Sequence, residues 1–106
     1  MRRASGKHDR PIVIERMILE QDDFGQEIPT WVEFHRCYAH NSPLTGSERF
    51  GSDGKHGQAV TKLFFRYKSG IKTTMRVKLS GEYFRIVAVT EVGRREEIEL
   101  YLERYE

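Results

Sequence analysis

Apolar side chains recur at every second position through most of this chain, and that spacing constrains its fold more than any other feature. Between residues 97 and 103, Ile98, Leu100 and Leu102 alternate with glutamates and a tyrosine. Such alternation is typical of a strand with one buried face. Glu and Leu are also good helix formers, so propensity alone would allow a helix here, but the period favours a strand.

Five further segments have the composition or alternation of strands. Ser80-Gly81 separates two of them and predicts a tight hairpin turn. In the first segment the apolar positions change phase between Ile14 and Met17, which indicates a β-bulge. The five segments are residues 10–19, 31–39, 59–67, 75–79 and 82–89.

Six strands without a strong amphipathic helix predict an all-β domain. A small β-barrel of about six strands, closed or partly open, is the expected architecture, because curling a sheet removes its exposed edges. We divide the 106 residues into a basic N-terminal arm, 1–10, and a single barrel domain, 11–106. Residues 20–31 are acidic and contain turn-forming residues, so they are expected to form a hairpin tip. The expected core consists of Ile12, Ile14, Trp31, Leu63, Phe65, Val77, Phe84, Ile86, Leu100 and Leu102.

A glycine-rich segment, residues 45–58, interrupts the predicted strands. It reads TGSERFGSDGKHGQ, with four glycines and one large apolar residue, Phe50, so it can bury almost nothing. Each glycine inside a helix costs about 1 kcal/mol relative to alanine, so any helix should be confined to roughly residues 47–50. We expect an inserted flexible loop with at most that one helical turn. Loops of this length are uncommon in compact domains unless they are functional.

Charge is distributed unevenly along the chain, although the formal net charge is only +2. Residues 47–78 sum to +6, whereas residues 91–106 sum to −3. A basic middle beside an acidic end is suited to nucleic acid, or to a head-to-tail contact between identical subunits. A solvated surface is the simplest interpretation of any single charge.

Residues that could support catalysis or bind a metal are few. The Gly-Lys pair at 54–55 is followed by histidine and does not connect a strand to a helix, so a phosphate-binding loop is not indicated. His35, Cys37 and His40 form the richest metal-like set, but only the two remaining histidines could complete it, and zinc needs three or four ligands. Cys37 also lacks an acid that would orient a histidine beside it for nucleophilic catalysis. We therefore expect no enzyme activity, no metal and no cofactor.

Nothing in the sequence predicts export or membrane insertion. The basic N-terminus is not followed by the apolar stretch of a signal peptide, and no apolar run approaches the roughly 20 residues that span a bilayer. The single cysteine excludes an internal disulfide and fits a reducing compartment. Synthesis in the cytoplasm is the expectation.

Four motifs stand out in order along the chain: Asp23-Phe24-Gly25 followed by Trp31, Pro43-Leu44-Thr45-Gly46, Arg66-Tyr67-x-x-Gly70-Ile71 and Met75-Arg76-Val77. Taken together, they resemble the head–tail joining proteins of long-tailed bacteriophages, also called head-closure, head-completion or stopper proteins. The resemblance covers nearly the whole chain and rests on the order and spacing of the motifs rather than on any one of them. Similar proteins also occur in phage-like gene transfer particles.

The resemblance implies a small β-barrel and a structural role in the neck of the particle. It implies a ring, dodecameric in the particle, that is stacked beneath the portal and adaptor rings. Packaged double-stranded DNA would lie on the axis of this ring, and tail-completion or tail-tube proteins would dock on its far side. The protein would then close the filled head, help to retain DNA, and be located in the virion after synthesis in the bacterial host cytoplasm.

Three groups of residues become candidate sites under this interpretation. The segment after the Pro-Leu-Thr-Gly motif corresponds to an excursion toward the channel in the family, which makes it a candidate gating loop. The loop residues are Gly46, Ser47, Glu48, Arg49, Phe50, Gly51, Ser52, Asp53, Gly54, Lys55, His56 and Gly57. Candidate contacts to DNA or to other subunits are Arg49, Lys55, Lys62, Arg66, Arg76 and Lys78. Candidate ring or tail contacts are Asp22, Asp23, Phe24, Glu97, Glu99 and Glu103.

Two alternatives stay open. A small barrel of the oligonucleotide-binding type would use the basic middle of the chain, with Phe64, Phe65 and Tyr67, to stack on single-stranded nucleic acid. Against it, these aromatic residues fall on both faces of the predicted strand, as core packing would place them. The second alternative is a tail-completion protein, one ring lower in the neck.

Overall fold

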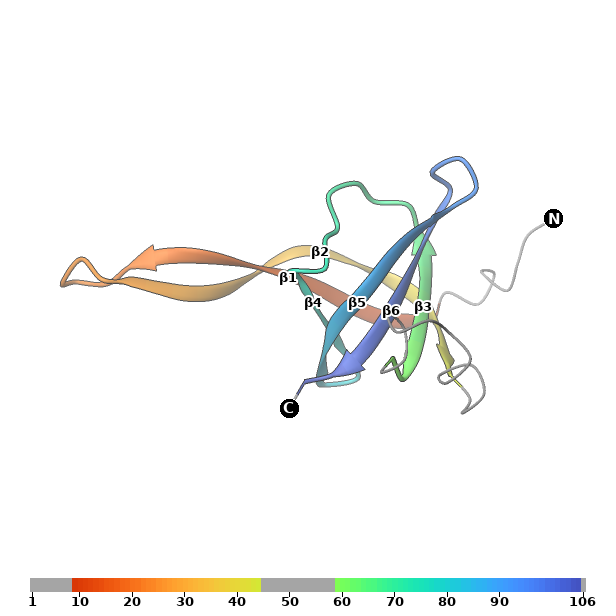
Figure 1. Ribbon diagram of the computed structural model, residues 1–106, viewed down its shortest axis with the longest axis horizontal. Helices are drawn as coiled ribbons and strands as arrows, with labels where there is room; N and C mark the ends of the chain where they lie inside the picture. The colour runs from red at the N-terminus through yellow and green to blue at the C-terminus, as the bar shows by residue number, and fades with distance from the viewer. Residues whose placement is uncertain (1–8, 45–58, 106) are drawn as a thin grey trace.

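Six strands form a closed antiparallel barrel in the computed structural model, which describes residues 9–44 and 59–105. The order around the barrel is β1-β2-β3-β6-β5-β4, and pairing of β4 with β1 closes it (Figure 1). The predicted all-β barrel is confirmed. The basic arm over 1–8 and the glycine-rich loop over 45–58 lie outside the described residues. The strands are β1 Arg10–Gln21, β2 Glu27–Pro43, β3 Thr61–Arg66, β4 Arg76–Leu79, β5 Glu82–Val92 and β6 Glu97–Arg104.

The barrel interior is filled by the inward-facing residue of each alternating pair. On β6, for example, Ile98, Leu100 and Leu102 are buried, as the alternation predicts. Trp31 was expected in this core, and that expectation is wrong. It is only half-buried, because its part of β2 extends beyond the barrel. The buried core cluster consists of Ile12, Ile14, Ala39, Leu63, Phe65, Met75, Val77, Leu79, Phe84, Ile86, Ile98, Leu100 and Leu102.

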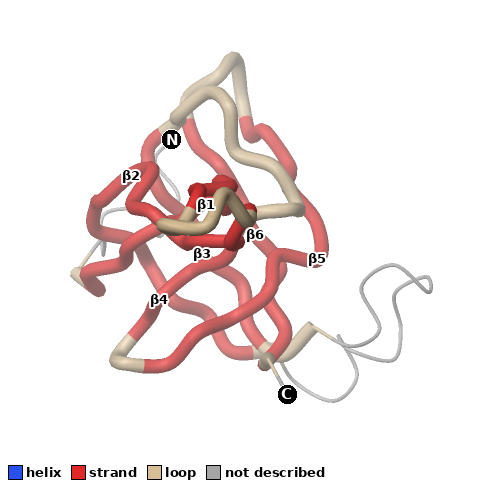
Figure 2. Tube along the Cα trace, turned by 90° about the vertical axis from the view of Figure 1, so that its left-hand side faces the viewer, coloured by secondary structure: helices blue, strands red, loops and turns tan. Residues whose placement is uncertain are grey.

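Strands β1 and β2 are longer than the barrel needs. β1 pairs with β4 only over residues 12–15, and β2 pairs with β3 only over residues 40–43. Residues 16–21 therefore pair with residues 27–32 alone. This two-stranded extension, residues 16–32, is here called the ribbon. Figure 1 shows it projecting from the barrel, and Figure 2 shows it nearly end-on, in front of the barrel strands.

The predicted β-bulge lies where the ribbon leaves the barrel. The register of β1 against β2 shifts between Ile14 and Glu15. A bulge bends its strand and increases the local twist. The extra residue belongs to β2 rather than to β1, because Ile14 lies opposite His35 and Glu15 lies opposite Glu33, which leaves Phe34 unpaired in the register. The expected change of phase in β1 is therefore wrong: Met17 and Leu19 lie on its exposed outer face.

A second bulge explains why the sequence of β5 is apolar on both faces. The register of β5 against β6 shifts between Ile86 and Ala88. Ile86 lies opposite Leu102, and Val89 lies opposite Leu100, so both face the interior although they are three positions apart. The phase of the strand changes by one residue at this point.

Two tight turns follow from local sequence chemistry. At the ribbon tip the carboxylate of Asp22 accepts hydrogen bonds from the backbone N–H groups of Phe24 and Gln26, each at 2.9 Å. Gly25 has φ +84°, which a residue without a Cβ adopts readily. Between β4 and β5, Ser80 and Gly81 both have positive φ, as a two-residue hairpin turn of type I′ requires. Both predicted hairpins are confirmed.

Truncation of the core should destabilise the barrel strongly. Phe84→Ala or Ile86→Ala should lower the free energy of unfolding by about 2–5 kcal/mol, because each leaves a cavity in a closed core. Leu19→Ala is the matched control, since Leu19 is 60% exposed on the ribbon and should cost little. Thermal and urea unfolding would measure the difference. An unchanged melting temperature in either core variant would contradict the assigned strand phase.

Candidate interaction surfaces

The ribbon exposes apolar side chains on both of its faces. Met17 lies opposite Trp31, and Leu19 lies opposite Pro29, so these four share one face. The exposed fractions are 47% for Met17, 60% for Leu19, 44% for Ile28 and 90% for Phe24 at the tip. A two-stranded hairpin alone is at best marginally stable in water, and contiguous exposed apolar surface marks interaction sites. The ribbon therefore has the character of a contact surface.

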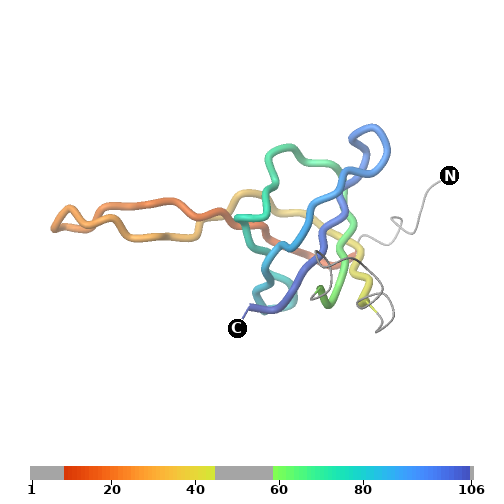
Figure 3. Tube along the Cα trace, in the orientation of Figure 1, coloured from red at the N-terminus to blue at the C-terminus, as the bar shows by residue number. Residues whose placement is uncertain are grey.

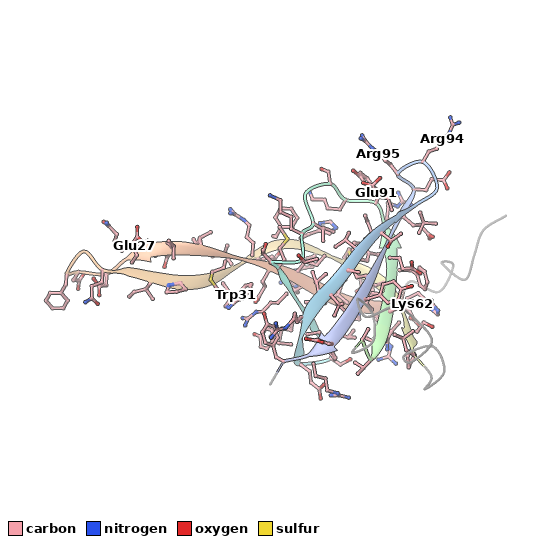
Figure 4. All side chains as sticks on the ribbon, viewed as in Figure 1. Glu27, Trp31, Lys62, Glu91, Arg94 and Arg95 are labelled. Atoms are coloured by element: carbon pink, nitrogen blue, oxygen red, sulfur yellow. The ribbon has the colours of Figure 1, made fainter. Side chains whose placement is uncertain are left out.

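The ribbon is also acidic. The ribbon, residues 16–32, contains four carboxylates and one cation, Arg16, so its formal net charge is −3. The rest of the chain therefore carries a formal net charge of +5, against +2 for the whole. Asp22 is occupied in the turn, whereas Asp23 and Glu27 are exposed (Glu27 is labelled in Figure 4). A partner of this surface should be cationic.

An arginine fixes the root of the ribbon to the barrel. The guanidinium carbon of Arg76 lies 4.3 Å from the Trp31 ring centroid and 3.9 Å from that of Tyr83. Its Nε donates to a carboxylate oxygen of Glu15 at 2.7 Å. We call these four residues the clamp. It joins β4 and β5 of the barrel to both strands at the ribbon root, and the two ionic side chains are less than one-fifth exposed.

Clamp formation explains the position of Trp31. Cation–π contacts are worth about 0.5–2 kcal/mol each and are stronger where water is excluded. The Trp31 ring therefore packs on a guanidinium rather than in the barrel core. Arg76, a candidate contact to DNA or a subunit in the sequence, is largely covered in this arrangement.

Charges that the sequence assigned to separate surfaces are interleaved on the outside of one sheet. The Lys62 ammonium lies 3.7 Å from a Glu99 carboxylate oxygen, and Arg85 Nε lies 3.3 Å from one of Glu103. Lys62 also lies 5.4 Å from the Phe64 ring centroid (Figure 4). The basic and acidic segments are thus brought together within the chain, because β3 and β5 both pair with β6.

The remaining candidate contacts are more accessible. Arg66 is exposed at the end of β3, where Glu97 is its cross-strand neighbour. Lys78 is exposed on β4, with its ammonium 5.7 Å from the Tyr83 ring centroid. Phe24 lies at the ribbon tip. Arg49 and Lys55 lie outside the described residues.

One basic cluster was missed by the sequence reasoning. The β3–β4 connection, residues 67–75, and the β5–β6 turn, residues 93–96, lie side by side at one end of the barrel (Figure 3). The Tyr67 N–H donates to the Glu96 carbonyl at 3.1 Å and links them. We call this the basic end. Its cations are Lys68, Lys72, Arg94 and Arg95.

The residues of the basic end are far apart in sequence, and this is why the charge pattern did not reveal them. Arg94 and Arg95 occur in an acidic stretch, so a running sum of charge conceals them. Both point away from the barrel at the β5–β6 turn (Figure 4). The only signal for the basic end in the sequence was the position of these cations in predicted loops, next to the ends of strands.

The histidine and cysteine set on β2 does not converge on one point. His35 and Cys37 lie opposite Ile14 and Ile12 and share the inner face, whereas the His40 ring packs on Phe64 at 6.1 Å between centroids. Burial, with a contribution from the nearby Lys68 ammonium, lowers the pKa of His35. Among residues 9–44 and 59–105, no cluster of three or more His, Cys, Asp or Glu side chains could hold a metal ion. The same residues contain no helix able to cross a membrane.

These features define the class of protein: a small closed antiparallel β-barrel with a projecting ribbon and exterior contact surfaces. The sequence profile of the family described as phage head completion protein matches residues 3–104. The chain therefore belongs to the phage head completion protein family, and it is a structural protein of the virion. The expected resemblance is confirmed.

Two solved structures have the same fold. A solution structure of protein SF1141 from Shigella flexneri 2a has a TM-score of 0.81 and 20% sequence identity, covering 98% of this chain and 96% of that one. A chain in the virion of a native gene transfer agent particle has a TM-score of 0.62 and 20% identity, covering 92% and 94%. A comparison with curated protein sequences gave no match.

Loss of the clamp should loosen the ribbon. Arg76→Ala should cost about 2 kcal/mol, because it removes two cation–π contacts and leaves the Glu15 carboxylate without its partner. Arg76→Lys should lose less stability than Arg76→Ala but should not match the wild type, since an ammonium cannot stack as a planar guanidinium does. Hydrogen exchange at residues 16–21 and 27–32 should accelerate in both variants. Lys78→Ala, on the same strand, is the control, and equal exchange in all three would contradict the clamp.

The thiol of Cys37 should be unreactive in the folded protein. Burial raises its pKa from 9.0 to about 11. Near pH 8 the thiolate fraction should then be on the order of 100-fold lower than in the unfolded chain, and thiolate is the reacting form. The rate of disulfide exchange with an aromatic disulfide reagent, with and without urea, measures this, and Cys37→Ser is the blank. Similar rates in both states would show that the side chain is not shielded.

Proposed function

We propose that this protein is a ring-forming connector of the phage neck that closes the DNA-filled head after packaging and offers the docking surface for the tail. Membership of the head completion family supports a location in the virion, between head and tail. The fold shared with a chain of a gene transfer agent virion supports a place in such a particle. On this proposal the protein has a structural rather than a catalytic role.

The observation that carries the proposal is the ribbon. The barrel is closed and has no free strand edges, and four of the seven large hydrophobic side chains that are exposed among the described residues lie on the ribbon. Leu19 and Phe24 remain exposed in the single chain. That arrangement suits a subunit whose neighbours in an assembly cover the extension. The proposed neighbours are further copies in a ring, a portal or adaptor ring above, and tail-completion or tail-tube proteins below.

We further propose that residues 46–57 face the channel of this ring and control passage of DNA. Arg49 and Lys55 would approach the phosphates, while Glu48 and Asp53 keep the net charge of the loop at zero, apart from its histidine. Phosphate affinity grows with each charge neutralised, so a balanced loop should not hold moving DNA tightly. Lys62, Arg66 and Lys78 are secondary candidates for DNA or subunit contacts.

Deletion of residues 47–56 tests the channel role. The barrel should still fold, because none of its core residues is removed and shortening a loop costs little entropy. Particles carrying the deletion should package DNA but leak it or fail to join tails. DNA retention is measured by nuclease sensitivity of purified heads, with a same-length Gly/Ser replacement as the control for loop length.

Location in the particle is tested separately. Imaging of particles that contain a labelled copy should place the label between head and tail. Wild-type retention and tail joining in deletion particles whose neck rings still assemble would remove the channel role. A label found elsewhere in the particle would remove the connector role itself. Strong, salt-dependent binding of a short single strand by the isolated protein would favour the oligonucleotide-binding alternative instead.

A further inference from the structure

We propose that the acidic ribbon of one copy docks on the basic end of a second copy of this chain. The inference rests on the proposed ring and names the two surfaces that would build it. Ribbon and basic end are different parts of the molecule, so each copy offers one surface to each of two neighbours. Such a heterologous contact propagates head to tail and forms a ring when the rotation closes.

The first argument is the state of the ribbon in the single chain. Met17, Leu19 and Ile28 are each more than two-fifths exposed, and Phe24 is almost fully exposed at the tip. Within the described residues the backbone of the ribbon pairs only with itself. The clamp nevertheless holds its root in one orientation. An apolar surface that is presented rigidly loses little conformational entropy on docking, which favours binding.

The second argument is where unpaired positive charge remains. Five cations on the barrel and on β2 already have carboxylate partners within the chain, namely Arg36, Lys62, Arg76, Arg85 and Arg104. Lys68, Lys72, Arg94 and Arg95 form no ion pair with any described residue. Arg10, Arg16, Arg66 and Lys78 also lack an ion pair among the described residues, but the four cations of the basic end lie together, and the acidic ribbon is complementary to them in charge. Complementary charge selects the partner and sets the register of a contact.

The third argument is that the basic end also has an apolar component. The Lys68 ammonium lies 5.5 Å from the Phe34 ring centroid, and the Arg95 guanidinium carbon lies 5.9 Å from that of Tyr67. Both rings are half-buried. Cations resting on aromatic rings present a mixed surface, able to receive carboxylates and apolar side chains together. The ribbon carries that same mixture.

The geometry excludes the same contact within one chain. In Figures 1 and 3 the ribbon runs away from the barrel along the long axis, while the two loops of the basic end rise on another side. The clamp and the bulge at Ile14 fix this direction. The partner must therefore be another molecule. Glu91, labelled near Arg95 in Figure 4, and Glu96, the next residue after Arg95 in the sequence, dilute the positive charge, which favours a carboxylate-bearing protein surface over a polyphosphate chain.

The test uses the isolated full-length protein. A nitroxide spin label is attached at Gln21→Cys, near the ribbon tip, in a Cys37→Ser background with natural isotopes. This spin-labelled protein is mixed at millimolar concentration with nitrogen-15-enriched protein that carries no nitroxide. Amide signals of residues 67–72 and 93–96 in the nitrogen-15-enriched protein should lose more than half of their intensity. Those of the β4–β5 turn at residues 80–81 should not, and added salt should reverse the loss.

Charge reversal identifies the surfaces. Glu20→Lys, Asp23→Lys and Glu27→Lys together should abolish the effect, as should Lys68→Glu, Arg94→Glu and Arg95→Glu together. Mixing the two reversed proteins should restore it. Lys78→Glu, which reverses an exposed unpaired cation elsewhere on the barrel, should leave the effect unchanged.

Several outcomes would overturn this contact. They are uniform signal loss, loss confined to other residues, no loss at millimolar concentration, or no restoration on mixing the reversed proteins. Selective shifts at the basic end caused by a short DNA duplex, without any effect of the ribbon label, would assign the basic end to nucleic acid. Particle imaging is independent of this test. A neck location without ribbon contact would leave the proposed function standing and remove only this inference.

Discussion

The short pairing between β1 and β4 is the constraint on which the rest of the structure depends. Only residues 12–15 of β1 meet β4, yet these pairs close the barrel and so remove the free edges of the sheet. The same limit leaves everything beyond Glu15 without a third strand. The short register of β1 against β4 therefore has two consequences: it closes the barrel, and it leaves the ribbon projecting from it. The bulge opposite Ile14 lies at this junction, and its extra residue, Phe34, belongs to β2.

The clamp converts this extension into a surface with a defined direction. Arg76 lies between Trp31 and Tyr83 and is hydrogen-bonded to Glu15, so strands β1, β2, β4 and β5 meet at one guanidinium. Planar stacking combined with a charged hydrogen bond is a combination that arginine makes and lysine does not.

The positions of the charged side chains in the fold matter more in this protein than the formal net charge. β3–β6 and β5–β6 pairing brings cations of two strands against carboxylates of the acidic C-terminal strand, as the Lys62–Glu99 and Arg85–Glu103 pairs show. Exposed pairs of this kind contribute little to stability, about 0–1 kcal/mol each. Their effect is to leave the ribbon negative and the basic end positive.

Local chemistry in the sequence was sufficient for the strands and for the turns at residues 22–26 and 80–81, and it indicated where the first bulge lies but not that its extra residue is on β2. Each depends on residues within a few positions of one another, where a period of two and turn-forming side chains are decisive. The family could also be predicted from the sequence, because it is identified by several motifs in a fixed order along the chain. Only the tertiary structure decided that Trp31 packs on Arg76 outside the core, that Lys62 has a carboxylate partner, and that Lys68 and Arg95 gather at one end. Those outcomes depend on the pairing of strands far apart in sequence, β1 with β4 and β3 with β6. Alternation shows which face of a strand is apolar, but it does not show which strand lies beside it.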